Sequence, residues 1–591
     1  MNRIFFIILS IGVLFFSCNI ERKKDNLIEG NFFYSIPDEK IEMSVLDNYR
    51  FVTLPRNDDY ETAHININDL SSEDVYFIIT TTGSPNSLSA PSNNIKNRGI
   101  SSNIANINTK KNKEHISKFN ENPFAYINLK DIDKTYKNRL DNSNVLKRDS
   151  VIGDTKTFYD DQDGEIEATC RFVDNIHGKT LNIWVENRYW FSSKDPSHVK
   201  NSINQNMIEK LADKFLNSRK EDIYHWVTNI FGEEWGSHSF SEMIPASEAG
   251  NINILLCDID DDEDNFSGLS KGKVLGYFYS KDNFTVVPQP NPRSNRMLMF
   301  YIDAPTFSYK EDNALWDING FWSNEIISTL AHEFQHMIHF YQKAVKTGTG
   351  KSSDTWLDEM CSMVTEDLLA DKLNTNGPRG VESDNPSSKP NNENGKLTVF
   401  NRYNGEDLTS WLGDDDVIIS YANSYAFGAY IARNFGGAEL FNRIVSVNTN
   451  RNYEAVVKSI NDLNGTSETF FSLLQKWSVA VMLSDLTDNE IGYKYNNGDK
   501  WFESNFNNYI YKLGSINLYN YKFSDSLTGP YFVDYTNRAN IYFDTNDASV
   551  DVERTNNNSN YYIKGGEKIN GPFYKKLYLI PNQYVTIVFK K

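Results

Sequence analysis

Three of the nine histidines of the chain, His332, His336 and His339, lie in one short apolar stretch, LAHEFQHMIHFYQ. Residues four apart on an α-helix project from the same side, so His332 and His336 can bring two ring nitrogens to one metal ion. Glu333 follows the first of them and can reach a water molecule at that ion. Burying two imidazoles and a carboxylate on an apolar helix costs free energy unless a bound partner such as a metal ion compensates for the lost hydration. This HExxH spacing is typical of a zinc site with a glutamate general base.

A catalytic zinc site has three protein ligands and one position open to water. His339 lies three residues after His336 on the same helix, in a poorer position for chelation than the His332–His336 pair, so we expect it to flank the site. The next helical segment, SDTWLDEMCSMVTEDLLADKL, carries Glu359 one turn inside an apolar face. We predict Glu359 as the third ligand, and Asp358 and Glu366 are the alternatives.

Both segments have the periodicity and the end signals of helices. Apolar side chains recur every three to four positions in the first: Ile326, Leu330, Phe334, Met337, Ile338 and Tyr341. Ser323 is a suitable N-cap and Gly348 can end that helix. Thr355 and Asp358 resemble a capping box at the start of the second. We therefore expect two helices joined by a short loop, which can pack side by side.

The two segments TLAHEFQHMIHFYQK and TWLDEMCSMVTEDLL resemble the hyicolysin family of secreted bacterial zinc metallopeptidases. More broadly they are similar to the gluzincins, which include thermolysin and aminopeptidase N. The resemblance covers about Thr155 to Val481. It implies a zincin-like domain, peptide-bond hydrolysis, and a glutamate ligand on the second helix, here Glu359. Thermolysin-like members have an aspartate where this chain has Met363, so another residue must orient the histidine ligand.

A tyrosine is the candidate for stabilising the oxyanion that develops during peptide hydrolysis. The segment ISYANSY resembles the SYxKG stretch of aminopeptidase N-like enzymes, in which the tyrosine donates to the oxyanion. This resemblance points to Tyr421, with Tyr425 as the alternative. The lysine and glycine of that stretch are absent here, so a tyrosine packed within a helix is an equally good interpretation.

An acidic run, CDIDDDEDN, follows a predicted buried strand. Clustered carboxylates could hold Ca²⁺, which prefers hard oxygen ligands. The aspartates are Asp258, Asp260, Asp261, Asp262 and Asp264. The run lacks the glycine and the distal glutamate of an EF-hand, which favours a solvated acidic loop.

The first residues predict export. Residues 4–16 form an almost wholly apolar run after Arg3, too short to span a membrane comfortably, and Cys18 follows Ser17. This resembles a bacterial lipoprotein signal, which implies a lipid on Cys18 and a membrane anchor at the cell envelope or surface. The alternative is an ordinary secretory signal and an extracellular product.

Composition sets the remaining limits. A chain of 591 residues suggests about three to four domains, and a net charge of -19 argues against a nucleic-acid partner. We expect an α+β catalytic domain with a mixed sheet, flanked by β-rich modules at both ends. The predicted parts are 1–17 signal peptide, 18–40 tether, 41–85 small β-rich module, 86–150 Asn/Ser-rich linker or pro-region, 151–484 zinc metallopeptidase domain, and 495–591 β-sandwich-like domain. The polar loop 374–396 is expected to be a surface insertion.

These observations predict an exported zinc-dependent endopeptidase that acts on proteins or peptides. A surface adhesin or binding lipoprotein with a structural or degenerate zinc domain is the alternative. Structural zinc sites are usually closed by four ligands, commonly cysteines. Cys170, Cys257 and Cys361 have apolar neighbours and are expected to be buried small hydrophobes. A structural zinc site does not need a general base such as Glu333, so the presence of Glu333 favours the enzyme interpretation over the binding protein.

Overall fold

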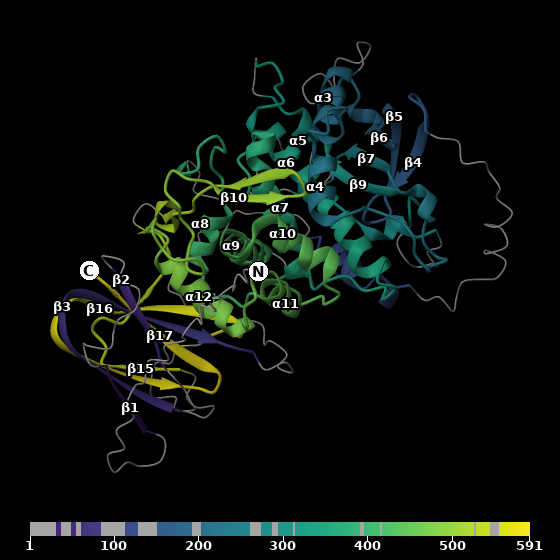
Figure 1. The fold of residues 1–591 in the computed structure, drawn as a ribbon. Coiled ribbons are helices and arrows are strands. Elements are labelled where there is room, and N and C mark those ends of the chain that lie inside the picture. Colours follow the sequence, from purple (N-terminus) through teal and green to yellow (C-terminus); the bar gives the residue numbers. More distant parts are fainter. Residues whose placement is uncertain are drawn as a thin grey trace, which may run out of the picture. The chain divides into compact units, whose positions relative to one another are not determined.

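The computed structural model divides into two compact units (Figure 1). It describes residues 31–36, 49–54, 61–83, 113–127, 150–191, 202–259, 274–285, 293–310, 314–390, 395–413, 416–524, 527–543, 553 and 555–591. The larger unit comprises residues 80–531 and 556–561, and the smaller one comprises residues 1–79, 532–555 and 562–591. Cys18, the signal peptide and the acidic run from Asp260 to Asp264 lie outside the described residues.

A six-stranded mixed sheet forms one layer of the larger unit, in the order β4-β5-β6-β7-β9-β8. The strands are β4 Thr155–Tyr159, β5 Glu165–Ile176, β6 Lys179–Glu186, β7 Asn251–Cys257, β8 Gly276–Tyr277 and β9 Leu298–Asp303. The pairs β6·β7 and β7·β9 are parallel, whereas β4, β5 and β8 pair antiparallel with their neighbours. Every side chain of β9 is buried, as expected for a strand covered on both faces. The mixed sheet agrees with the predicted α+β class.

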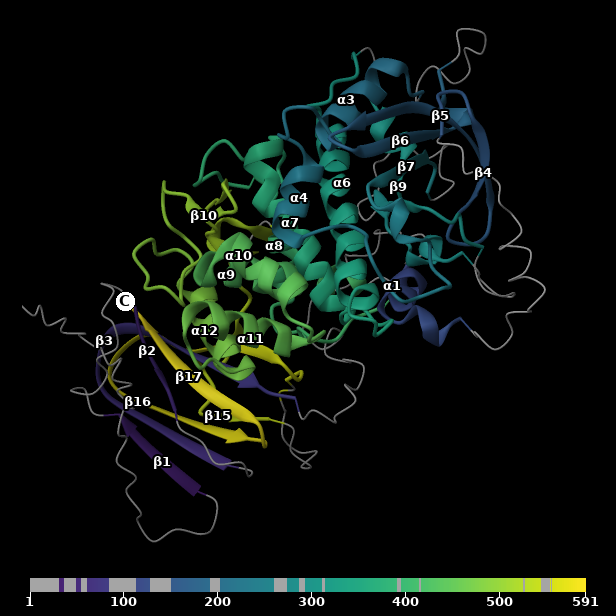
Figure 2. The same cartoon turned by 45° about the vertical axis from the view of Figure 1, so that its right-hand side comes forward.

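Helices form the second layer and most of the rest of the larger unit. They are α1 Glu114–Glu121, α3 Gln205–Phe215, α4 Ile223–Phe231, α5 Ala304–Ser308, α6 Phe321–Phe340, α7 Thr355–Leu373, α8 Lys396–Arg402, α9 Val417–Phe435, α10 Gly437–Asn442, α11 Tyr453–Asn464 and α12 Phe470–Met482. Helix α6 lies between β9 and α7, and α7 packs in turn on α9 (Figure 2). Two short hairpins, β10 Phe502–Phe506 with β11 Tyr509–Leu513 and β12 Lys522–Ser524 with β13 Leu527–Thr528, complete the unit. Within the described ranges, no helix carries an apolar stretch that would cross a lipid bilayer.

The ends of the two predicted site helices differ from expectation. Helix α6 begins after Gly320, so Ser323 is buried in its first turn and does not cap it. The helix continues as a π-helical turn over Tyr341–Val345. Asp354 is the N-cap residue of α7, and the predicted capping box does not form because Thr355 and Asp358 bond elsewhere. Tertiary contacts thus override local end signals at both helices.

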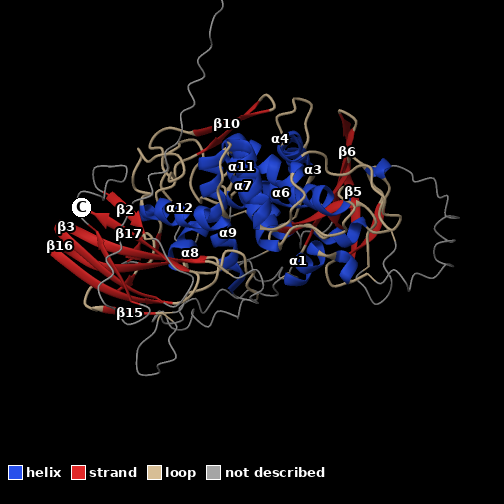
Figure 3. Cartoon of the chain, turned by 60° about the horizontal axis from the view of Figure 1, so that its bottom comes forward, coloured by secondary structure: helices blue, strands red, loops and turns tan. Residues whose placement is uncertain are grey.

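The smaller unit joins strands from both ends of the chain in one seven-stranded sheet. Its strands, red in Figure 3, are β1 Asn31–Ile36, β2 Tyr49–Thr53, β3 Glu61–Thr81, β14 Val533–Asp534, β15 Asn540–Tyr542, β16 Ser559–Leu579 and β17 Gln583–Lys590. Strand β3 lies between β16 and β17, and β2 pairs with β17. The prediction of separate β-rich modules at 41–85 and 495–591 is therefore wrong in its pairing. Two or three strands alone bury too little surface to be stable, and the partner strands come from the other end of the chain.

Two segments expected to lie outside the core are part of the larger unit. Within the predicted linker 86–150, residues 113–127 form α1 and a 3₁₀ turn, and Ile116 and Phe119 are buried. Within loop 374–396, Arg379 is 2% exposed and forms an ion pair with Asp367. Both segments are polar in composition, which predicted a linker and a surface loop. The few side chains that pack or pair within the larger unit could not be recognised from that composition.

Candidate metal centre

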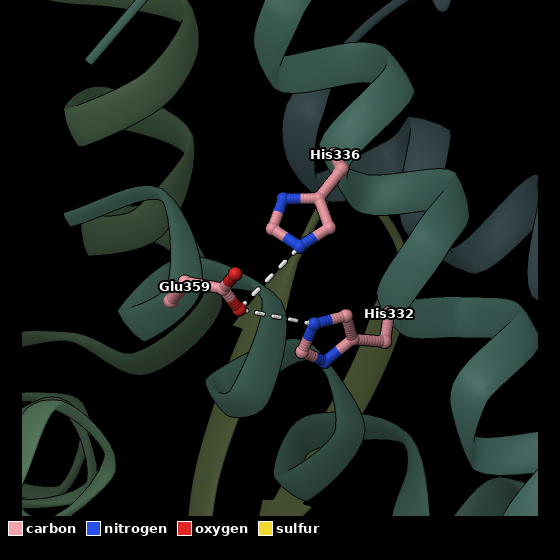
Figure 4. A group of neighbouring side chains, drawn as sticks. All are labelled: His332, His336 and Glu359. Atoms are coloured by element: carbon pink, nitrogen blue, oxygen red, sulfur yellow. Dashed lines mark ion pairs between the residues drawn. The ribbon is translucent and has the colours of Figure 1, made fainter. Parts of the chain in front are cut away.

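Side chains from two helices meet at one point in the larger unit (Figure 4). Helix α6 supplies His332 and His336, and the adjacent helix α7 supplies Glu359. The Oε2 atom of Glu359 lies 3.2 Å from Nε2 of His332 and 3.5 Å from Nε2 of His336. The three potential ligand atoms lie within 4.8 Å of one another, and no other group of this kind occurs among the described residues.

The chemistry of this set fits a zinc ion. Two imidazole nitrogens and one carboxylate oxygen are a ligand set of catalytic zinc sites, which keep one further position open. The Oε2 atom of Glu359 is buried and has no hydrogen bond of sound geometry. Burial raises the pKa of Glu359, but the adjacent His336 and His332 outweigh it and lower the pKa to about 2. The carboxylate therefore stays ionised, as a metal ligand must.

His332 is held from its far side by a second carboxylate. Its Nδ1 atom lies 2.8 Å from Oε1 of Glu366, and the hydroxyl of Ser328 donates to Oε2 of Glu366 at 2.7 Å. An Nδ1–H bonded to Glu366 leaves the lone pair of Nε2 directed toward Glu359. Glu366, an alternative ligand on sequence grounds, thus takes the orienting position that Met363 cannot fill.

Asp358 lies at ion-pair distance from two histidines but makes no hydrogen bond of sound geometry with them. Its Oδ1 atom lies 3.0 Å from Nδ1 of His336 and 3.0 Å from Nδ1 of His339. The hydroxyl of Ser362 is the hydrogen-bond partner of His336, 3.1 Å from its Nδ1 atom. The Nε2 atom of His339 is 2.8 Å from the hydroxyl of Ser353. Both nitrogens of His339 are therefore engaged outside the group of three ligands. The structure places Asp358 and His339 as neighbours that support the site.

Glu333 lies beside the two histidines and the edge of the sheet. Burial raises the pKa of its carboxyl, while His332, His336 and the backbone N–H of Phe278 lower it in part. Phe278 directly follows β8, the edge strand of the six-stranded sheet. Glu333 as a whole is 5% exposed, so bulk water has little access to it.

The two tyrosine candidates lie in different surroundings. The hydroxyl of Tyr421 donates to Oε1 of Glu359 at 3.2 Å. Burial raises the pKa of Tyr421, and Glu359 and Glu333 raise it further, so the phenol stays protonated as a donor. Tyr425 donates instead to Asp367 at 3.0 Å, in a buried ion cluster with Arg433. Tyr421 is adjacent to the metal centre and Tyr425 is not.

The described part of the acidic run does not support a calcium site. Asp258 accepts a hydrogen bond from the hydroxyl of Tyr189 at 2.7 Å and lies 3.5 Å from the guanidinium of Arg188. Both contacts are made by the Oδ2 atom, which is thus engaged within the protein. The prediction of bound calcium has no support in the described residues.

Removing the charge of Glu366 should weaken metal binding without removing a ligand. The variant Glu366→Gln is expected to lower zinc affinity by about 10–100-fold, because the amide no longer fixes the tautomer of His332 as firmly. Competition with a chromogenic chelator measures this. Asp371→Asn, further along α7, is the control and should bind zinc like the parent. Unchanged affinity of Glu366→Gln would show that the contact does not position His332.

Comparison with known proteins agrees with the geometry. The family model described as Peptidase M30 matches residues 165–502, a range that includes α6, α7 and α9. The chain is also similar to neutral metalloprotease ShpI of Staphylococcus hyicus, with 28% identity over 271 residues, 46% of this chain and 49% of that protein. The chain thus matches about half the length of this relative. Because the family match covers more than half of the chain and both helices of the metal centre, the chain belongs to the Peptidase M30 family, which confirms the resemblance to the hyicolysins.

Proposed function

We propose that this member of the Peptidase M30 family is a zinc-dependent endopeptidase that hydrolyses peptide bonds in proteins or peptides. The observation that carries the proposal is the convergence of His332, His336 and Glu359 with Glu333 buried beside them. Two histidines and a glutamate leave room for water, whereas structural zinc sites usually have four protein ligands. A carboxylate next to such a site suits the deprotonation of that water.

Different side chains have different roles in the proposed hydrolysis. When bound, zinc acts as a Lewis acid that polarises a carbonyl and makes a water molecule easier to deprotonate. Glu333 accepts a proton from the attacking water and passes it to the leaving amine. Its raised pKa suits both tasks, because a group that titrates nearer to neutral pH can accept and release a proton. Tyr421 donates a hydrogen bond to the developing oxyanion.

A chelator experiment tests the proposed activity. Purified protein is incubated with casein, with casein and a chelator, and with chelator followed by excess zinc. We expect cleavage, loss of cleavage and recovery, respectively. A preparation that holds one zinc per chain and cleaves neither casein nor a mixed peptide library would contradict the enzyme and favour a binding protein with a structural zinc.

Export and a lipid anchor on Cys18 complete the proposal. A lipid on this residue would hold the protein at the bacterial cell envelope or surface. We expect Cys18→Ala to lose incorporation of a labelled fatty acid and to move from the detergent phase to the aqueous phase on phase separation, because a lipid chain dominates that partition. Ser17→Ala, one residue earlier, keeps the cysteine and is the control. Equal partition of parent and Cys18→Ala would refute the anchor.

A further inference from the structure

Helix α6 is buried along most of its length but is accessible on one stripe. Between Ile326 and Phe340, the partly exposed residues are Thr329 and His332, and Glu325 just before them is partly exposed as well. Spacings of four and three residues place these three side chains on the same face of the helix. Glu325 lies about 10 Å from His332 along the helix axis. The accessible stripe of Glu325, Thr329 and His332 thus leads along α6 to the metal centre.

The carboxylate of Glu325 is unpaired at the far end of this stripe. It makes no hydrogen bond and no ion pair within the described part of the chain. Burial and the nearby Glu366 raise the pKa of its carboxyl to about 7, and Lys396 lowers it only in part. Carboxylates form their strongest hydrogen bonds with cationic donors. Glu325 can therefore pair with a cation that comes from outside the chain.

Thr329 separates Glu325 from the metal centre without offering a free polar group. Its hydroxyl donates to the carbonyl oxygen of Glu325 at 2.8 Å, within the helix. Its methyl group lies against Gly276 of β8, where an added Cβ atom would come within 2.8 Å of Cγ2 of Thr329. The middle of the stripe is therefore apolar, and its charge is at the end marked by Glu325.

Partly exposed residues of other elements lie around the same stripe. The Nζ atom of Lys396, at the start of α8, lies 6.0 Å from the ring centre of Tyr421, and the ring of Trp411 meets Tyr421 edge-on at 4.9 Å. Lys396 acts on both Glu325 and Glu366 through its charge. Glu366 is already bonded at the metal centre. Two carboxylates thus face one ammonium, which leaves a net negative charge near the stripe.

We propose that Glu325 is a specificity-determining residue that selects substrates with a lysine or arginine next to the scissile bond. The long stems of these side chains pack along apolar surface while their charged heads reach further. With the scissile carbonyl at the metal centre, the stem lies along Thr329 and the head pairs with Glu325. A short side chain does not reach this carboxylate, and an acidic one meets a like charge. This inference rests on the proposed peptidase function.

Matched fluorogenic peptides test this charge preference. They differ in one residue, lysine or the similarly long but neutral methionine, placed directly before or directly after the scissile bond. The assay is run at mildly alkaline pH, where Glu325 is ionised. At one of the two positions, we expect the zinc-loaded parent to cleave the lysine peptide with a kcat/KM about 10- to 100-fold higher, the effect of one hydrogen bond to a charged group.

Charge variants and a binding measurement make the result specific. Glu325→Gln should cleave the lysine and methionine peptides alike, and Glu325→Lys should prefer a glutamate peptide to the lysine peptide. Glu490→Gln removes an exposed carboxylate beyond α12 and should retain the preference of the parent. All variants should hold equal zinc. In the inactive Glu333→Gln background, calorimetry should show tighter binding of the lysine peptide, and adding Glu325→Gln should abolish the difference.

The outcomes separate this role of Glu325 from the function on which it rests. A parent that cleaves both peptides equally at both positions would overturn the role, as would a lysine preference that survives in Glu325→Gln. A parent that prefers glutamate would also overturn it, because Lys396 would then dominate. In these three cases the peptidase function stands. If the parent and all variants bind zinc and cleave no peptide, the proposed function fails, and the role of Glu325 fails with it.

Discussion

Replacing Glu333 by Gln is expected to lower kcat for peptide hydrolysis by about 10³-fold, within the range measured for loss of a general acid–base group. The substitution preserves the shape of the side chain and its contact with Phe278, but an amide cannot accept the proton of the attacking water. Because Glu333 lies beside the ligands and is not one of them, bound zinc should stay near one per chain. Metal analysis and initial rates on one peptide measure both effects.

Two comparisons make the Glu333 result specific. Glu439→Gln removes the charge of a partly exposed glutamate on α10 that pairs with Arg443, and it should leave kcat unchanged. Thermal unfolding of the zinc-loaded proteins checks that both variants are folded. If Glu333→Gln keeps kcat within a factor of ten of the parent, the general base is another group.

The local part of the metal centre could be predicted because it depends on one helix. A spacing of four residues places His332 and His336 on the same face wherever the helix lies. Glu359 could be predicted because a short loop lets the next helix pack alongside. The role of Glu366 in orienting His332 was not predicted, since it depends on the register of α7 against α6. It lies seven residues after Glu359, two turns along the same face, and this spacing is the signal that could have identified it.

Contacts between distant segments were not predictable in the same way. The alternation of β3 and β16 indicates strands but does not specify a partner, and these strands pair across almost the whole chain. Likewise, the polar run around α1 has the composition of a linker. Its two buried side chains, Ile116 and Phe119, are what distinguish α1 from a linker. Their burial could not be predicted from the sequence, because Phe119 packs on Tyr279 and Phe284, which are distant in the chain.

Glu359→Ala is expected to lower zinc affinity by more than about 100-fold, which exceeds the usual effect of losing a residue that only orients a ligand. Two imidazoles alone leave the ion without the carboxylate that faces both Nε2 atoms. Hydrolysis should fall together with zinc content, and excess zinc should restore it only in part. Tyr421 also loses its acceptor in this variant.

His339→Ala is the matched comparison, because it removes the third histidine of the same apolar stretch. Its ring forms hydrogen bonds with Gln335 and Ser353, and it lies beside Asp358 rather than in the ligand group, so zinc should stay bound. Loss of this buried ring leaves Asp358 with His336 as its remaining imidazole partner and should lower thermal stability. Zinc content therefore separates the two variants even if both unfold at a lower temperature than the parent. If His339→Ala loses zinc and Glu359→Ala retains it, the third ligand is His339, and α7 supports the site without binding the metal.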